Sequence, residues 1–436
     1  MFICPNCGGN LKFDIPSQQL GCEYCGTKMD VYSFEDKPET GVRPNDYDAT
    51  IFTCPQCAGE IISTDTSAAE FCTFCGASAI LHSRLTKEKR PGYIIPFQKT
   101  KEDCKKAYSD MMKKAIFAPD ALKNPKYIDG FRGIYMPYWA FHLTQEDSFS
   151  LSGSSSKRRG DYIYTDHYAL KGEISAYYKG LSYDAASSFD DNISEKVAPF
   201  DVKGMKAFTP AFLSGFYADT ADVDASNFEE KAKEIAMSHS QNAIYGEFSG
   251  ISIDLQTPPT IDTQVKEIDS AMFPVWFMSY HNAGRVAYAT VNGQTGKVVT
   301  DLPIDTQKYA KGSLLLALPI FLLLNLLFTI TPFALLVITI ILGFISVIIY
   351  SAEITSIKKK EPLQIKKSAL VSSIAAIVIC ILVAILQPAS DIFYYGAVIL
   401  SLSGIFYSFK DIIEYYNILA TRRLPQFDRT GGDDRA

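Results

Sequence analysis

Eight cysteines, arranged in four C-x2-C pairs, are the residues of this chain whose spacing is best suited to chemistry. Each position in the first two pairs reappears 50 residues later. A C-x2-C turn directs two thiolates at one point, and a second such turn completes the tetrahedral sulfur shell that Zn(II) accepts. The sequence therefore predicts two structural zinc ions, one held by Cys4, Cys7, Cys22 and Cys25 and the other by Cys54, Cys57, Cys72 and Cys75.

Two other uses of these cysteines are open, a disulfide or redox cluster and an iron site of the iron–sulfur or rubredoxin type. The first residues, Met1 to Cys4, run directly into the motif without a secretory signal, so we expect this part of the chain to stay in the cytoplasm. Cytoplasmic thiols stay reduced, which favours metal over disulfide. A segment of about 30 residues buries little apolar surface, so metal binding is expected to supply most of its folding free energy.

The knuckle sequences CPNCGG, CEYCGT, CPQCAG and CTFCGA resemble the zinc ribbons of the transcription-factor-IIB type, which also occur in primosomal helicases. The resemblance is specific for metal binding but not for nucleic acid. Residues 1–80 contain four basic and eleven acidic residues, a net charge of −7, and each Zn(Cys)4 centre adds two further negative charges. Such a module repels a phosphate backbone, so we expect no nucleic-acid binding.

Two ribbons are expected, at residues 1–32 and 51–82, joined by a flexible acidic linker at 33–50. Two arrangements fit this pattern. On a flexible tether the ribbons would act as a bivalent docking device. Alternatively, both ribbons cap the domain that follows them.

The middle of the chain, residues 93–305, is predicted to be an α+β cytoplasmic domain. Helical periodicity covers Thr100 to Phe117 and Ser226 to about Tyr245. Each helix is later followed by a Pro-x-Trp strand, and these strands hold the chain's two tryptophans, Trp139 and Trp276. The repeat predicts two related units, at about 93–205 and 206–305.

Enzyme motifs are absent from the sequence, which contains no P-loop, GxGxxG, HExxH or GxSxG. His142 and Asp147 could form an acid/base pair, but so could many other pairs in the chain. The most basic part of the middle domain is Lys157-Arg158-Arg159. It is expected to be a solvated hairpin loop, with contact to anionic lipid headgroups as the alternative.

The last third of the chain is predicted to span a membrane. The mean hydropathy of +0.03 conceals an almost uncharged region rich in Leu, Ile and Val. Its first charge-free run, Gly312 to Ala352, would be about 60 Å long as one helix, roughly twice a bilayer core, so it must turn back. We expect four helices as two hairpins, at 312–350 and 368–409, with a basic cytoplasmic loop at 351–367 and a cytoplasmic tail at 410–436. The first hairpin is expected to turn at Thr331-Pro332, where Pro332 can open its second helix. Lysines and arginines flank the spans at one side only, which predicts a multi-pass cell-membrane protein with ribbons, middle domain and C-terminus in the cytoplasm.

Taken together, the cysteine pairs and the segments YIIPF, GIYMPYWAF, FPVWF and VNGQTGKVV resemble bacterial membrane proteins with tandem TFIIB-type zinc ribbons, a family often mislabelled as primosomal or replication helicases. The resemblance implies a multidomain fold of two ribbons, an α+β domain and a transmembrane region. It also implies partners of the phage-shock-A-like or flotillin-like type in envelope stress.

The leading hypothesis is a non-enzymatic membrane adaptor that recruits a cytoplasmic protein. The alternatives are a membrane-bound enzyme acting on lipid or envelope substrates through the middle domain, and a zinc-regulated sensor.

Overall fold

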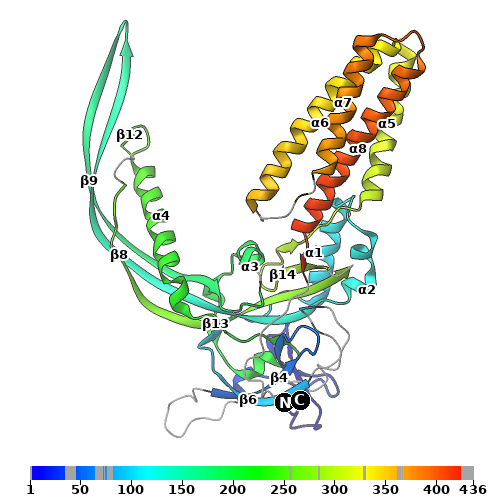
Figure 1. Cartoon of the computed structure of the whole chain (residues 1–436). Coiled ribbons are helices and arrows are strands. Elements are labelled where there is room, and N and C mark those ends of the chain that lie inside the picture. The colour runs from blue at the N-terminus through cyan, green and yellow to red at the C-terminus, as the bar shows by residue number, and fades with distance from the viewer. Residues whose placement is uncertain are drawn as a thin grey trace, which may run out of the picture.

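The computed structural model describes residues 2–34, 46–63, 72, 74–75, 82–189, 191–254, 258–282, 285–327, 330–360, 365 and 367–423. Figure 1 shows a large curved sheet at the base, from which a long β-hairpin rises on one side and a helical bundle on the other. The two cysteine-rich segments lie below the sheet, on the side away from the bundle. The molecule is therefore open between its hairpin and its bundle.

The first ribbon is a small antiparallel sheet of its own. It consists of β1 (Leu11–Asp14), β2 (Gln19–Cys22) and β3 (Lys28–Met29), followed by the 3-10 turn η1 (Val31–Phe34). The second cysteine segment instead contributes β4 (Asp46–Thr53), β5 (Glu60–Ser63) and β6 (His82–Lys89) to the large sheet. Residues 35–45 of the expected linker lie outside the described part of the chain, whereas Asp46–Thr50 already belongs to β4.

Within the described residues the large sheet has thirteen strands and contains the longest strands of the molecule. Its centre is β8 (Arg132–Arg159), which pairs antiparallel with β13 (Thr263–Asn282) on one edge and with β9 (Tyr162–Asp184) on the other. The other strands are β7 (Tyr93–Ile94), β10 (Lys206–Ala207), β11 (Tyr217–Ala218), β12 (Ser252–Ile253), β14 (Arg285–Asn292), β15 (Val298–Thr300) and β16 (Arg422–Arg423).

Polar side chains cap the start of the first helix and of several short helical turns in the middle domain. Thr100 forms a capping box with Asp103 and starts α1 (Lys101–Lys114). The second predicted helix begins later than Ser226: the 3-10 turn η6 (Ala225–Phe228) is capped by Asp224, and α4 (Glu229–Glu247) follows it without a side-chain cap of its own. The remaining short helices are η3 (Asp120–Lys123), α2 (Pro125–Ile128), α3 (Asp191–Val197), η4 (Val202–Gly204) and η5 (Pro210–Leu213).

The strand pairing of the sheet has a pseudo-two-fold pattern. Ile134 of β8 pairs with β11 in parallel, and Ala271 of β13, 137 positions later, pairs with β7 in parallel. The two tryptophans are also 137 positions apart. Each donates a hydrogen bond to a backbone carbonyl that lies just before a helix, α4 for Trp139 and α1 for Trp276. Trp139 Nε1 binds the Val223 carbonyl at 2.8 Å, and Trp276 Nε1 binds the Lys99 carbonyl at 2.9 Å. This pattern agrees with the predicted repeat of two related units, which itself stays a prediction. The unit boundaries near residue 205 stay a prediction.

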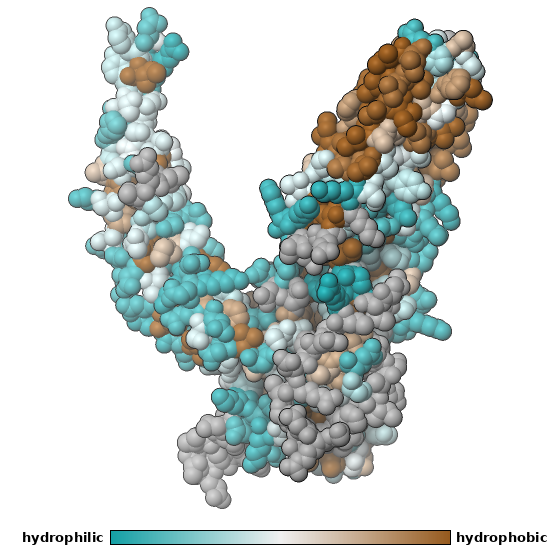
Figure 2. All heavy atoms as spheres, viewed as in Figure 1, coloured by the Kyte–Doolittle hydropathy of each residue, from teal (hydrophilic) through white to brown (hydrophobic). Residues whose placement is uncertain are grey.

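The C-terminal helices are α5 (Thr306–Leu327), α6 (Pro332–Lys360), α7 (Ser368–Leu386) and α8 (Ile392–Leu419). In the described part of the chain, α6, α7 and α8 are long and apolar enough to cross a membrane. Figure 2 shows a broad hydrophobic surface on the bundle, as lipid contact requires. The helix starts at Pro332 and Ser368 agree with the predicted ones, but α6 and α8 extend past 350 and 409. A fourth span at α5 stays a prediction.

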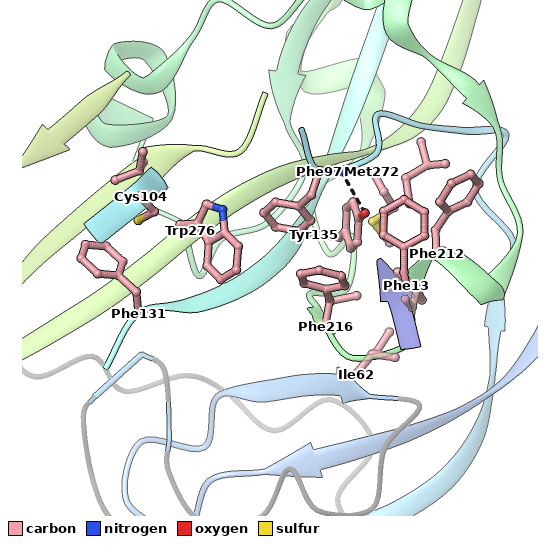
Figure 3. Close-up of a cluster of buried hydrophobic side chains, with 14 of the residues drawn as sticks. Phe13, Ile62, Phe97, Cys104, Phe131, Tyr135, Phe212, Phe216, Met272 and Trp276 are labelled. Atoms are coloured by element: carbon pink, nitrogen blue, oxygen red, sulfur yellow. Dashed lines mark hydrogen bonds between the residues drawn. The ribbon is translucent and has the colours of Figure 1, made fainter. Parts of the chain in front are cut away.

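The main core lies where the first ribbon meets the sheet. Figure 3 shows Phe13 of β1 pointing into a group of aromatic side chains from the sheet and its connections. Phe97 stacks on Phe216 at 4.5 Å between ring centroids, and the Tyr135 hydroxyl accepts a hydrogen bond from the Phe97 amide. The ribbon and the sheet therefore share one hydrophobic core.

Candidate metal centres

Three of the four cysteine knuckles have the same described backbone geometry. The carbonyls of Cys4, Cys22 and Cys54 each accept a hydrogen bond from the amide four residues later, at 2.9, 3.0 and 2.9 Å. The donors are Gly8, Gly26 and Ala58, and all three have positive φ, of 75°, 71° and 59°. Glycine adopts a positive φ without steric cost, which accounts for Gly8 and Gly26 at these positions. Ala58 has the same backbone conformation at a steric cost, which the hydrogen bonding of the knuckle offsets.

The structure brings the eight predicted cysteines together in two groups of four. Within each group the sulfur atoms all lie within 4.8 Å of one another. Close sulfur–sulfur contacts between the two knuckles are Cys4–Cys25 at 3.6 Å and Cys7–Cys22 at 3.4 Å in the first group, and Cys54–Cys75 at 3.8 Å and Cys57–Cys72 at 3.6 Å in the second.

These distances fit a tetrahedral zinc centre. A Zn–S bond of about 2.3 Å with tetrahedral angles places neighbouring sulfurs about 3.8 Å apart. A disulfide would need two sulfurs about 2.05 Å apart, much closer than any of the contacts above. The eight cysteines could therefore hold two metal ions. When bound, each ion cross-links two knuckles, and four sulfur ligands leave no open position for catalysis.

The two centres differ in their access to solvent. In the first, Cys4 and Cys22 are buried while Cys7 and Cys25 are exposed; in the second, all four cysteines are buried. Hydrogen bonds from the side chain and the backbone amide of Thr27 lower the pKa of the Cys25 thiol to about 6, which favours the thiolate that a metal ligand requires. A chelator should therefore reach the first centre more easily.

The first ribbon is attached to the sheet by both apolar and polar contacts. The Phe13 ring lies 5.2 Å from that of Phe212, and the Phe13 amide donates to the Ser214 carbonyl at 3.0 Å. Gln18 Nε2 donates to the Phe97 carbonyl at 2.8 Å, and the Tyr32 hydroxyl donates to the Ala207 carbonyl at 3.0 Å. This arrangement agrees with the alternative in which the ribbons cap the next domain, rather than with a freely tethered docking device.

The second centre is linked to the sheet and, through it, to the bundle. The Tyr288 hydroxyl donates to the carbonyl of Phe74, which lies between Cys72 and Cys75, at 3.1 Å. Arg422, which follows α8, lies over the Tyr288 ring at 5.5 Å and forms an ion pair with Asp301. A short chain of contacts thus joins the metal-binding knuckle to the end of the last long helix.

The His142–Asp147 pair, one of many that the sequence allowed, is not formed. His142 is buried, and its Nε2 lies 3.0 Å from Asp269 Oδ2 of the neighbouring strand. Asp147 instead accepts hydrogen bonds from the amides of Ser148 and Asp262. The partner of His142 is far away in sequence, and only the pairing of β8 with β13 brings the two together.

Sequence reasoning missed a polar cleft of about 540 Å³ beside β8, which is lined by Trp139, Asp219 and Asp222 among others. Burial raises the pKa of Asp219 to about 7, although the Ser188 hydroxyl and the Thr220 amide donate hydrogen bonds to its carboxylate. The segment Asp219–Asp224 carries no recognisable motif, so the sequence held no signal for this cleft.

Comparisons with known proteins give one informative relative. The chain is 34% identical over 313 residues to the uncharacterized protein YdjG of Bacillus subtilis (strain 168), a match that covers 71% of this chain and 92% of that protein. No family model matches the chain, and no solved structure matches it significantly.

Proposed function

The chain belongs to the same family as YdjG of Bacillus subtilis, and from this premise we propose that it is a non-enzymatic, membrane-anchored zinc-ribbon adaptor. In this proposal two zinc ions hold the ribbons, the bundle lies in the cell membrane, and the ribbon surface binds a cytoplasmic protein. The observation that carries the proposal is the continuous attachment of the ribbons to the sheet and of the sheet to the bundle. A partner bound at the ribbons would be held at the membrane.

The bundle is attached to the rest of the chain at the start of its first helix and at the end of its last helix. At the start of α5, Lys308 forms an ion pair with Asp120 at 2.5 Å. At the end of α8, the Arg285 guanidinium donates to the Ile418 carbonyl at 2.6 Å, and the side chain of Asn417 both donates to and accepts from the backbone of Ile304. These contacts fix the direction in which the ribbons face, away from the bundle.

The membrane topology that we propose has four spans with the sheet and the ribbons in the cytoplasm. The start of α5, the end of α6, the start of α7 and the end of α8 all lie at the end of the bundle nearest the sheet. Basic residues are placed at these ends, namely Lys308, Lys311, Lys358, Lys359, Lys360, Lys367, Arg422 and Arg423. By the positive-inside rule this end faces the cytoplasm.

The binding surface that we propose is the exposed side of the first ribbon. Tyr24 is 81% exposed and Ile3 is 57% exposed, on a segment that zinc and the sheet hold rigidly. Exposed apolar side chains on a rigid support are typical of protein interfaces, since they lose little conformational entropy on binding. The surrounding acidic residues favour a partner with a basic face. A phage-shock-A-like or flotillin-like protein, and hence a role in envelope stress, is the proposed identity.

The test is affinity purification of the full chain in detergent, followed by mass spectrometry. An Ile3→Ser/Tyr24→Ala variant is compared with the wild type and with Ile116→Ser, a control that removes an exposed apolar side chain 65% accessible to solvent at the end of α1. We expect a soluble partner with the wild type and the control, and its loss with the double variant. If the double variant still captures the partner, the binding surface lies on another part of the chain. If no partner is captured by the wild type, the adaptor proposal is refuted.

An enzymatic function has one feature in its favour, the cleft beside β8 with the buried Asp219. A raised carboxyl pKa in a cleft is a known attribute of acid/base sites. If the cleft is catalytic, Asp219→Asn should abolish turnover of a lipid or envelope substrate without affecting partner capture. The zinc-regulated sensor makes a different prediction, that partner capture follows the occupancy of the accessible first centre.

A further inference from the structure

The tip of the β8–β9 hairpin is a surface that the adaptor proposal leaves unused. The last pair of β8 with β13 is Gln145 with Thr263, and β8 continues beyond it to Arg159, paired only with β9 and briefly with β12. This extension is about 45 Å long at the usual rise of a strand. Figure 1 shows it as an arm that leaves the same face of the sheet as the bundle.

The arm is covered along its lower part and bare at its tip. Leu151 and Leu170 are buried against Ile244 of α4, and β12 pairs with β8 at Ser154 and Gly153. Beyond that point every residue from 156 to 169 is exposed. A two-stranded ribbon without a covering layer is only marginally stable in water, so a long bare tip points to contact with something else.

The composition of the tip indicates what that contact is. Tyr162 is 72% exposed and Ile163 is 71% exposed, and Tyr164 is also exposed. Each lies directly across the ribbon from a cation, in the pairs Arg159–Tyr162, Arg158–Ile163 and Lys157–Tyr164. Tyrosines with an apolar ring and a polar hydroxyl favour the headgroup level of a bilayer, and lysine or arginine near an anionic surface gains about fivefold in binding per residue. Asp161 in the turn is the one acidic residue between Lys157 and Tyr164.

The direction of the tip also fits a membrane. Side chains alternate along a strand, so Lys157 and Arg159 lie on the same face of the ribbon as Leu151, the face that α4 covers lower down. Their partners Tyr164 and Tyr162 share this face. Figure 1 shows α4 on the side of the arm that faces the bundle, and Figure 2 shows a hydrophobic patch near the end of the arm. Lys157, Arg159, Tyr162 and Tyr164 are thus presented toward the space beside the bundle, while Arg158 and Ile163 lie on the opposite face of the ribbon.

We propose that the tip of this arm, Lys157–Tyr164, binds the headgroup layer of anionic phospholipids in the membrane leaflet that the bundle enters. The arm and the bundle are then two attachments of one rigid sheet to one membrane. Because the bundle already holds the chain at the bilayer, the tip needs only a weak intrinsic affinity. The second attachment fixes the tilt of the sheet and therefore the direction in which the ribbons face the cytoplasm.

The experiment uses the full chain in vesicles of phosphatidylcholine with or without phosphatidylglycerol, both brominated in their acyl chains. Bromine quenches tryptophan fluorescence on contact, so a tryptophan placed at the tip reports its insertion. Trp139 and Trp276 are the chain's own tryptophans, hydrogen-bonded within the sheet, and give a constant background. The test variant is Tyr162→Trp, with Tyr164→Trp as a second probe. The control is Tyr24→Trp, which places the probe on the exposed first ribbon.

We expect the added tryptophan of Tyr162→Trp to be quenched in anionic vesicles and that of Tyr24→Trp to remain unquenched. Removing Lys157, Arg158 and Arg159 together by alanine should lower the ratio of bound to free tip by about a hundredfold, since each cation contributes about fivefold. Equal responses of both tip probes and the Tyr24→Trp control in anionic vesicles would overturn the proposal. Quenching that is the same without phosphatidylglycerol would overturn the role of the cations.

Discussion

The attachment of the first ribbon to the sheet can be separated from its metal centre by one substitution, Phe13→Ala. Phe13 is buried between the ribbon and the sheet, with its ring 5.2 Å from that of Phe212 and 6.4 Å from that of Phe216. Truncation of such a phenylalanine costs about 3 to 5 kcal/mol. At least four hydrogen bonds remain between the ribbon and the sheet, including one from the Ser214 hydroxyl to the Leu11 carbonyl, and each contributes only about 1 kcal/mol. We expect the ribbon to leave the sheet far more often while its four cysteines still hold zinc.

Hydrogen exchange measured by mass spectrometry reports this directly. The residue-13 amide donates to the Ser214 carbonyl, so its protection depends on the docked ribbon and not on the ribbon's own strands. A loss of 3 to 5 kcal/mol corresponds to faster exchange by about 100- to 5,000-fold, provided exchange occurs through undocking. Elemental analysis should still find two zinc ions per chain. Ile3→Ala, which truncates an exposed side chain of the same ribbon, is the matched control.

Two results would refute this reasoning. Unchanged exchange at residue 13 would show that the apolar contact with Phe212 does not hold the ribbon in place. If the variant loses one zinc ion as well as the exchange protection of the residue-13 amide, the ribbon cannot keep its fold without the sheet. In that case the metal alone does not supply the ribbon's stability, contrary to the expectation from its size.

Three further predictions follow from the metal centres and the buried carboxyl. In a chelator challenge followed with a zinc indicator, one ion should leave quickly from the centre with exposed Cys7 and Cys25 and one slowly; Cys7→Ser should remove the fast phase only, and a single phase of two ions would contradict this. Ala58→Gly should stabilise the second ribbon by about 1 kcal/mol, because Ala58 has a φ of 59°, and Gly8→Ala, where an added Cβ meets no atom within 4 Å, should destabilise the first ribbon by a similar amount. Chemical unfolding of each ribbon, followed by exchange of its own peptides, checks both. Asp219 has a folded pKa of about 7 against an ordinary value of 3.8, so the folded state binds more protons and its stability falls as pH rises through 7. Between pH 6 and 8 the free energy of unfolding of the wild type should fall by about 1.4 kcal/mol more than that of Asp219→Asn. An equal change with pH in the two proteins would refute the assignment.

What could be predicted from the sequence was local. The two cysteine groups follow from C-x2-C spacing, because a knuckle is a short turn whose geometry depends on its own residues. The starts of α6 at Pro332 and of α7 at Ser368 follow from the boundaries of apolar runs and from proline's preference for the first helical turn. A single knuckle or helix start depends on residues within one or two turns of chain, and the two knuckles of one metal group are still only 21 residues apart, from Cys4 to Cys25 and from Cys54 to Cys75.

What could not be predicted was the pairing of distant segments. The second ribbon joins the large sheet because β5 pairs with β11, so that Ser63 meets Tyr217. His142 is likewise paired with Asp269 of another strand and not with Asp147 nearby in sequence. Both β5 and β11 are short strands whose own residues do not specify a partner. The choice is made by the packing of the whole core, which no local pattern reveals.

The asymmetry between the two ribbons bears on how the molecule could transmit a change in metal occupancy. The first ribbon has its own small sheet and meets the large sheet through side-chain packing, so losing its metal breaks no strand pairing of the large sheet. The second ribbon supplies strands to that sheet, and its Phe74 carbonyl accepts the Tyr288 hydroxyl, whose ring lies beneath Arg422 at the end of α8. Loss of the second metal would therefore reach the sheet and the bundle together. Because losing the second metal would disturb the whole molecule, the buried second centre is better suited to holding the fold. A zinc-dependent switch needs a metal that can exchange with solvent, and it is better placed at the accessible first centre.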